Sequence, residues 1–163
     1  MPRLHALDPE NAGGASDPLL RTLAAAPDIT ASLQQHAQLV MRAGNVPELT
    51  KVLCAAMAAG LSYCQPSLTA HRRRARQLGA HAPMLSAIWD YASSDCFTPA
   101  QKAALAATVA LTREPRALPD GLWNDLRAHY SDSQIVELLC VIGLANYLDR
   151  VSNALQTEMP RPE

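Results

Sequence analysis

Apolar residues recur at helical spacing along most of the chain, and Pro, Gly and capping residues break this pattern into segments. No stretch shows the strict apolar–polar alternation of a half-buried strand. The pattern therefore predicts an all-α fold of about eight helices. They are expected over residues 19–25, 28–43, 47–60, 64–79, 83–93, 99–113, a short stretch after 120, and 135–155.

Two of these helices begin with capping boxes, in which a Ser or Thr side chain and a Gln three residues later satisfy exposed backbone N–H groups. The boxes are Thr98-Pro99-Ala100-Gln101 and Ser131-x-x-Gln134. The helix after the second box is apolar on nearly every side in its first half. We therefore expect it to be central and buried, with Cys140 in the core.

The periodic part of the chain has the length of one domain. Residues 1–17 carry Pro, Gly, Asn and Ser without periodicity, which predicts a flexible N-terminal arm. Residues 18–156 are expected to form a single helical domain, and residues 157–163 a frayed tail.

Composition narrows the class of protein. Hydrophobic residues make up 48% of the chain but aromatic residues only 4%, so Ala and Leu carry the apolar content and favour helices. A net charge of −1 argues against a nucleic-acid-binding surface. The start of the chain lacks the apolar run of a signal peptide, and no apolar stretch is long enough to span a membrane. We therefore expect a cytoplasmic protein with reduced thiols.

The four cysteines and five histidines are scattered, without the spacing of a zinc site. No glycine-rich phosphate-binding loop is present in the sequence. The expectation is therefore that the protein uses neither a metal nor another cofactor.

The segment 60–79 holds the residues best suited to chemistry. If it is helical from Cys64, then Cys64, Ser67 and His71 fall at i, i+3 and i+7 and share one face. Cys64 would lie in the first turn, where the helix dipole favours a thiolate. The ordinary pKa of histidine lies near neutrality, which suits His71 for acid/base work.

This segment resembles the alkylhydroperoxidase AhpD-like and carboxymuconolactone decarboxylase superfamily. Its thiol branch carries Cys-x-x-Cys-x-x-x-His at a helix start, followed at four-residue steps by Ala and Gly. This chain has Cys64, Ser67, His71, Ala75 and Gly79 in those places. The resemblance extends over roughly residues 19–155, including the stretch FTPAQKAALAATVALTREPRALPDGLWNDLRAHYSDSQIVELLCVIGLANYLDRVSNAL.

The resemblance implies a helical domain, a small-molecule substrate and a homo-oligomer with its site near a subunit interface. In the peroxidase branch both motif cysteines cycle between dithiol and disulfide, and a glutamate on the preceding helix supports the histidine. Here Ser67 replaces the second cysteine and Val52 stands in the place of the glutamate. Glu48, one turn earlier, is the nearest candidate carboxylate, and Tyr63 is a candidate for substrate binding.

Three functions stay open at this point. The first is cofactor-independent acid/base chemistry by His71 on a small carboxylate or lactone-type substrate, as in the decarboxylase branch. Ser67, Tyr63 or Cys64 would orient the substrate. The second is thiol-dependent reduction of hydroperoxides or disulfides by Cys64 alone, resolved by an external thiol. The third is a non-catalytic small-molecule binder.

Overall fold

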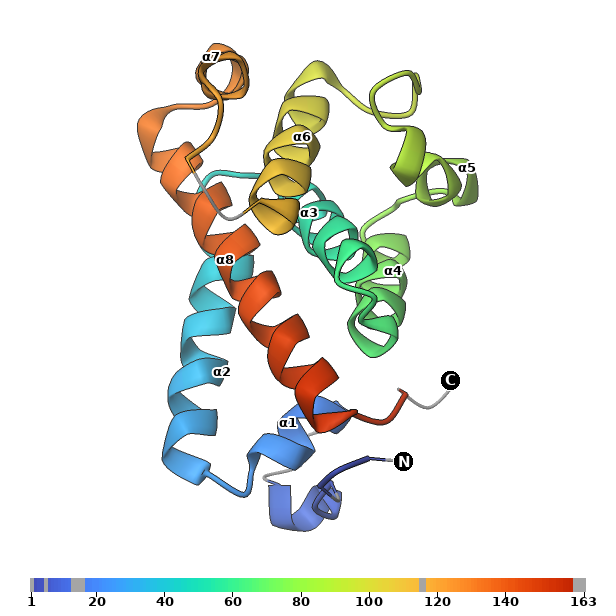
Figure 1. Ribbon diagram of the computed structural model, residues 1–163, viewed down its shortest axis with the longest axis vertical. Helices are drawn as coiled ribbons and strands as arrows, with labels where there is room; N and C mark the ends of the chain where they lie inside the picture. The colour runs from blue at the N-terminus through green and yellow to red at the C-terminus, as the bar shows by residue number, and fades with distance from the viewer. Residues whose placement is uncertain (1, 5, 13–16, 115–116, 160–163) are drawn as a thin grey trace.

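The computed structural model describes residues 2–4, 6–12, 17–114 and 117–159. Within these residues it contains eight α-helices, two short 3-10 helices and no strand, which confirms the prediction of an all-α fold (Figure 1). The helices are α1 (Pro18–Leu23), α2 (Pro27–Arg42), α3 (Glu48–Leu61), α4 (Gln65–Gln77), α5 (Ala82–Ser86), α6 (Pro99–Arg113), α7 (Asp120–His129) and α8 (Asp132–Leu155), with the 3-10 helices η1 (Pro9–Ala12) and η2 (Ala87–Asp90). None of these helices is long and apolar enough to cross a membrane.

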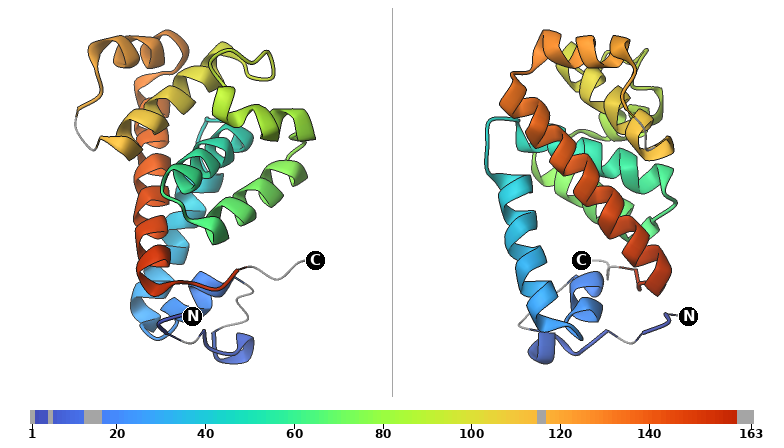
Figure 2. Two further views of the ribbon diagram at one scale, coloured as in Figure 1. Left: turned by 45° about the vertical axis from the view of Figure 1, so that its right-hand side comes forward. Right: turned by 60° about the vertical axis from the view of Figure 1, so that its left-hand side comes forward.

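Helix α3 is the centre of the fold. All of its residues from Thr50 to Ala59 are buried, and it packs against α4, α6 and α8 (Figures 1 and 2). Its alanines allow the neighbouring helices to approach closely, while Leu53 and Met57 fill the space toward α4, α5 and α6. Burying each of these two large side chains stabilises the fold by about 2 kcal/mol. Helix α4, which begins beside Cys64, is therefore held against a rigid support.

Helix α8 crosses the whole molecule beside α2, α3 and α6 (Figure 2). Its inner face, which includes Leu138, Ile142 and Asp149, is buried. Its outer face is open, and the expectation that Cys140 lies in the core is wrong because Cys140 is exposed. The neighbouring helices pack against α8 from one side only, so an apolar residue on the far side of the helix stays in contact with solvent.

The helix expected over 83–93 is shorter than predicted. Helix α5 ends at Ser86 and the chain tightens into η2. This tightening buries Ile88, while the ring of Trp89 lies against Gly60 so closely that a side chain at Gly60 would collide with it. The 3-10 turn thus fits the chain around the α3 backbone.

The ends of the chain pack against each other. The Arg3 N–H donates to the Leu155 carbonyl at 2.9 Å, and the Arg21 Nε donates to the Leu7 carbonyl at 2.6 Å. The predicted flexible arm over 1–17 and frayed tail over 157–163 include residues 1, 5, 13–16 and 160–163, which lie outside the described residues. The described parts of both ends lie beside α1 and the end of α8 (Figure 1).

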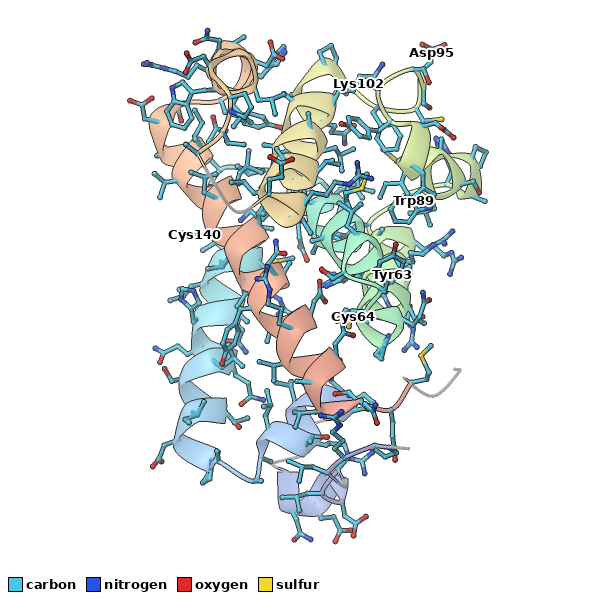
Figure 3. All side chains as sticks on the ribbon, in the orientation of Figure 1. Tyr63, Cys64, Trp89, Asp95, Lys102 and Cys140 are labelled. Atoms are coloured by element: carbon cyan, nitrogen blue, oxygen red, sulfur yellow. The ribbon has the colours of Figure 1, made fainter. Side chains whose placement is uncertain are left out.

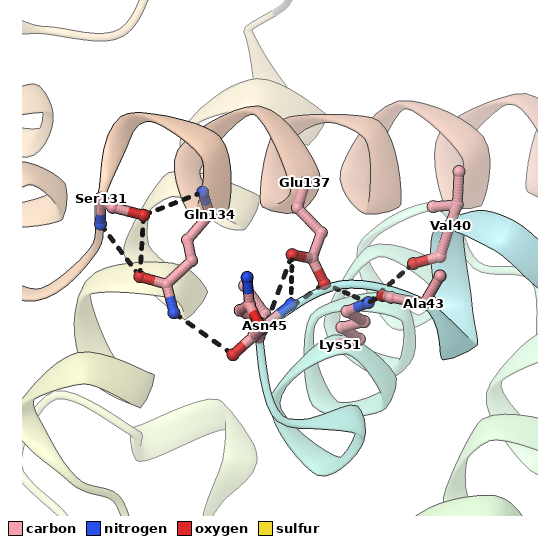
Figure 4. A network of polar contacts seen from close by, with 8 residues as sticks. Val40, Ala43, Asn45, Lys51, Ser131, Gln134 and Glu137 are labelled. Carbon is pink, nitrogen blue, oxygen red and sulfur yellow. Dashed lines mark hydrogen bonds and ion pairs between the residues drawn. The ribbon is translucent and has the colours of Figure 1, made fainter.

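A buried lysine joins α2, α3 and α8 (Figure 4). The Lys51 Nζ donates to the carbonyls of Val40 and Ala43 and forms an ion pair with Glu137. The Glu137 carboxylate also accepts the N–H of Asn45 at 3.0 Å. The end of α2 and the turn that follows it are thereby anchored to α8, and these contacts hold the pKa of Glu137 below its ordinary value.

Candidate functional site

The turn between α3 and α4 places Cys64. Tyr63 has a φ of 55°, a left-handed conformation that is uncommon for residues other than glycine. The Cys64 N–H then donates to the Ala59 carbonyl at 2.8 Å, and the Asn153 side chain of α8 donates to the Ser62 carbonyl at 2.8 Å. The turn is therefore fixed by α3 on one side and by α8 on the other.

Cys64 is the N-cap residue of α4, with Pro66 in the first turn as the sequence predicts. Its side chain is fully buried, between α4 and α8 (Figure 3). The Cys64 Sγ donates to the Ser67 Oγ at 3.2 Å. The first two residues of the predicted face are thus in direct contact.

Asp149 of α8 completes a cluster with these two residues. Its side chain is 1% exposed, and the Ser67 hydroxyl and the Cys64 thiol are hydrogen-bonding neighbours that favour its ionised form. Burial outweighs them and raises the pKa of Asp149 to about 6. The Oδ2 atom of the carboxyl is buried without a hydrogen-bond partner among the described residues.

Sequence reasoning did not single out Asp149. It lies outside the Cys-x-x-Ser motif, on the last helix, and a charged residue is ordinarily assigned to the exposed face. A signal was present, because Asp149 stands four residues after Ala145 and seven after Ile142, both on the buried stripe. A lone carboxylate in register with an apolar stripe is a buried charge, and buried charges are common at functional sites.

His71 lies on the same side of α4 as Ser67, one helical turn later. Both face the start of α1, since Ser67 lines a cavity with Asp17 and Asp17 is the charged group that acts on His71. Burial lowers the pKa of His71 to about 4, and the Asp17 carboxylate opposes this shift. The imidazole is therefore neutral at pH 7. It hydrogen-bonds to neither Ser67 nor Glu48.

The structure does not bring Glu48 and Tyr63 to the cluster. Glu48 lies at the start of α3, where its Oε1 accepts two hydrogen bonds from Arg74 at 3.0 and 2.6 Å. Arg74 is in the last turn of α4, about 15 Å along the helix axis from Cys64. The Tyr63 side chain is 85% exposed. A substrate at the cluster would therefore meet neither side chain in this arrangement.

A small cavity opens on Ser67. Its volume is about 30 Å³, and it is lined by Asp17, Pro18, Leu19, Pro66, Ser67, Ser152 and Thr157. The Thr157 hydroxyl is buried without a partner among the described residues. Polar cavities of this size hold one or two waters. The start of α1 and the end of α8 close the cavity.

The other three cysteines differ in environment. Cys54 is fully buried on α3, and burial raises its pKa to about 11 although a hydrogen bond with Thr108 lowers it. Cys96 is half-buried and Cys140 is exposed. The described residues include no group of three His, Cys, Asp or Glu side chains that could hold a metal ion.

Comparison with known proteins gives consistent matches. The model of the carboxymuconolactone decarboxylase family matches residues 27–110. The protein YdfG of Bacillus subtilis, itself uncharacterised, is 29% identical over 109 residues, which cover 66% of this chain and 71% of YdfG.

Solved structures show the same fold. The debrominase Bmp8 superposes with a TM-score of 0.80 at 20% identity, covering 93% of this chain and 81% of Bmp8. A similar match is a cysteine-to-alanine variant of Bmp8 with bound 2,3,4-tribromopyrrole. An uncharacterised peroxidase-related protein from Ralstonia eutropha, an alkylhydroperoxidase AhpD core, superposes with a TM-score of 0.79 at 17% identity. That match covers 95% of this chain and 80% of the Ralstonia protein.

Proposed function

The chain belongs to the carboxymuconolactone decarboxylase family, as its motif and C-terminal half predicted, and from this premise we propose that it reduces small hydroperoxides through the Cys64 thiol. The observation that carries the proposal is the buried Cys64 thiol, which donates to Ser67 and lies in a cluster with the buried Asp149 carboxyl. The debrominase Bmp8 and the Ralstonia peroxidase-related protein share this fold, and a complex of Bmp8 with 2,3,4-tribromopyrrole carries a cysteine-to-alanine substitution, which is in keeping with a thiol function.

The position of Cys64 suits a nucleophilic thiol. Cys64 occupies the N-cap position of α4, at the positive end of the helix dipole, although its side chain makes no capping hydrogen bond. Among the described residues no second cysteine stands beside it, because Ser67 occupies the place of the cysteine that attacks the hydroperoxide in the peroxidase branch, so Cys64 would have to take that role itself. The reaction cycle therefore needs an external thiol as reductant.

The proposed cycle is balanced with that reductant. The Cys64 thiolate attacks one peroxide oxygen, the O–O bond breaks, and the other oxygen leaves as an alcohol after taking up a proton. Cys64 is then a sulfenic acid. One external thiol condenses with it and releases water, and a second external thiol frees Cys64 and leaves as a disulfide with the first.

The size of the cavity favours the smallest hydroperoxides. A volume of about 30 Å³ beside Ser67 accommodates a molecule slightly larger than water, such as hydrogen peroxide. A lactone or an aromatic substrate would have to displace the start of α1. Hydrogen peroxide is accordingly the probe of choice.

Proton transfer by His71 is the second candidate. The family description names a decarboxylase, and the matched region includes His71. A neutral imidazole can accept a proton, but a pKa near 4 makes it a weak base at neutral pH. The geometry therefore ranks His71 behind Cys64.

Parallel variants separate the two candidates. Purified protein is treated with micromolar hydrogen peroxide in the presence of a sulfenic-acid trap and an external thiol, and adduct formation and peroxide consumption are measured. We expect Cys64→Ser to abolish both and His71→Ala to retain most of the rate. Cys140→Ser is the matched control, because it removes an exposed thiol and leaves the cluster intact.

The opposite ranking would overturn the thiol function. Loss of turnover in His71→Ala with survival in Cys64→Ser would assign the chemistry to the imidazole. If Cys64 resists micromolar peroxide in the wild-type protein, the peroxidase proposal fails outright.

A further inference from the structure

Asp149 is a charge that the fold does not need. It stands on the inner face of α8, in register with Ile142 and Ala145, where an apolar or amide side chain would pack without the cost of burying a carboxylate. No ion pair joins it to a described residue. A buried carboxyl group without a paired cation is a costly feature for a purely structural residue to keep.

The contacts of Asp149 point to Cys64. The thiol and the Ser67 hydroxyl approach the carboxyl group from α4, and they also contact each other at 3.2 Å. The Oδ2 atom is buried and has no partner within the described part of the chain. Of the charged and titratable groups, Cys64 acts on Asp149 from α4 and Arg150 from α8 itself.

We propose that Asp149 is the proton acceptor that ionises Cys64, with Ser67 holding the thiol and the carboxylate in register. This inference rests on the proposed function and adds to it a residue outside the Cys-x-x-Ser motif. Ser67 links the two groups, since it accepts a hydrogen bond from the Cys64 thiol at 3.2 Å and, with Cys64, is a neighbour that acts on the Asp149 carboxyl. His71 has no part in this step.

The proton step is balanced within the cluster. The S–H bond of Cys64 breaks, and the proton moves to the Asp149 carboxylate, leaving a thiolate and a neutral carboxylic acid. After the thiolate has cleaved the O–O bond, the same proton passes to the departing alkoxide. The carboxylate is then regenerated, and no oxidant or reductant is consumed in the transfer itself. The raised pKa of Asp149, about 6, suits a group that accepts and returns a proton near neutral pH.

The experiment follows oxidation of Cys64 by hydrogen peroxide from pH 5 to 9, by mass spectrometry of the peptide that contains Cys64. In the wild-type protein we expect the rate to rise through about pH 6, as Asp149 ionises. In Asp149→Asn we expect this inflection to disappear and the rate at pH 7.5 to fall about tenfold or more. Asp125→Asn, which changes an exposed carboxylate on α7, should keep the wild-type profile.

Ser67→Ala is the second variant. It should lower the rate less than Asp149→Asn and keep the inflection, since Asp149 still contacts the thiol. An unchanged profile in Asp149→Asn, or a wild-type rate without an inflection near pH 6, would overturn the proposal. If a variant fails to fold, the wild-type profile still tests the proposal, because a rate without an inflection near pH 6 overturns it.

A second probe separates this inference from the peroxidase function. Methyl methanethiosulfonate, a small thiol-modifying reagent, reports thiolate formation without any peroxide chemistry. If Cys64 reacts with it with the same Asp149-dependent profile but is inert to peroxide, the proton acceptor stands and the peroxidase function fails. If neither reagent shows a dependence on Asp149, the proton acceptor fails.

Discussion

At the scale of single residues, Asp149 and His71 contribute to the pH dependence of folding stability with opposite signs. The folded protein binds the Asp149 proton more tightly than the unfolded chain does, because its pKa is raised from 3.8 to about 6. Folding stability therefore falls as the pH rises from about 4 to 6. The pKa of His71 is lowered from 6.5 to about 4, so its contribution rises with pH in an overlapping window. The two contributions partly cancel, so the free energy of unfolding of the wild type, measured against pH, shows neither one separately.

The variant Asp149→Asn isolates the contribution of Asp149 to the pH dependence of stability. The amide keeps the shape of the side chain and removes the buried charge, so we expect the variant to be more stable than the wild type by about 1–2 kcal/mol at pH 7.5. The gain should vanish near pH 4, where Asp149 is protonated in the folded protein. Urea unfolding at the two pH values measures it, and the His71 contribution cancels in the difference. A gain that is equal at both pH values would contradict the burial of a charged Asp149.

The residues of the site were predictable in part. Helical spacing placed Cys64 and Ser67 together, because both lie within one turn of one helix and local geometry fixes their distance. Asp149 and Asp17 reach the site from other helices, and no local rule predicts which turn of α8 or α1 faces the start of α4. The same argument applies to Glu48, whose partner Arg74 is set by the antiparallel packing of α3 on α4.

At the scale of elements, Lys51 of α3 holds the end of α2 and helix α8 together. Lys51→Met leaves Glu137 and two backbone carbonyls without their cation, so we expect a loss of about 3 kcal/mol. Thermal and urea unfolding at pH 7 measure this loss. Lys102→Met is the control, because Lys102 makes an exposed bond to the Ala92 carbonyl and should change stability by less than about 1 kcal/mol.

The pH dependence of this join has a definite sign. The pKa of Glu137 is lowered, so its contribution to stability is present above its ordinary value of 4.5 and is lost as the pH falls through its folded value. The difference between the wild type and Lys51→Met should therefore shrink in acid. A difference that stays constant below pH 4 would show that Lys51 acts through the carbonyls alone.

Element boundaries were more predictable than element faces. Both capping boxes form as the sequence predicts, with the Thr98 and Ser131 hydroxyls accepting from the N–H groups of Gln101 and Gln134. These signals are local and depend only on neighbouring residues. The outward direction of Cys140 and the 3-10 turn at η2 depend on which neighbours pack against a helix. The local sequence of a segment does not show which helices those neighbours are.

At the scale of the whole molecule, the start of α1 closes the cavity on Ser67, the residue that contacts Cys64. Asp17 caps this helix, since its carboxylate accepts the N–H groups of Leu19 at 2.7 Å and Leu20 at 3.3 Å. Asp17, Pro18 and Leu19 all line the cavity beside Ser67. We therefore expect the stability of this short helix to control access to the cluster from the side of Ser67.

Asp17→Ala should open the site. Loss of a helix cap costs about 1 kcal/mol, which corresponds to about a fivefold larger open population. We expect Cys64 to react with iodoacetamide about fivefold faster, as followed by mass spectrometry of its peptide. Asp120→Ala changes an acidic residue in the first turn of α7 and should leave the rate unchanged. Equal rates in Asp17→Ala and wild type would mean that reagents reach Cys64 by another route.

The labelling rates of the two buried thiols also report how often the protein opens locally and how often it unfolds globally. Cys54 is enclosed at the centre of the fold with a pKa of about 11, so its modification requires general unfolding of the chain. Cys64 is enclosed in the turn before α4, next to the cavity on Ser67, so we expect a local fluctuation to be enough to expose it. When reclosing is faster than labelling, the ratio of the two labelling rates gives the ratio of the local and global opening constants. A single labelling time course on the wild-type chain would thus yield this ratio.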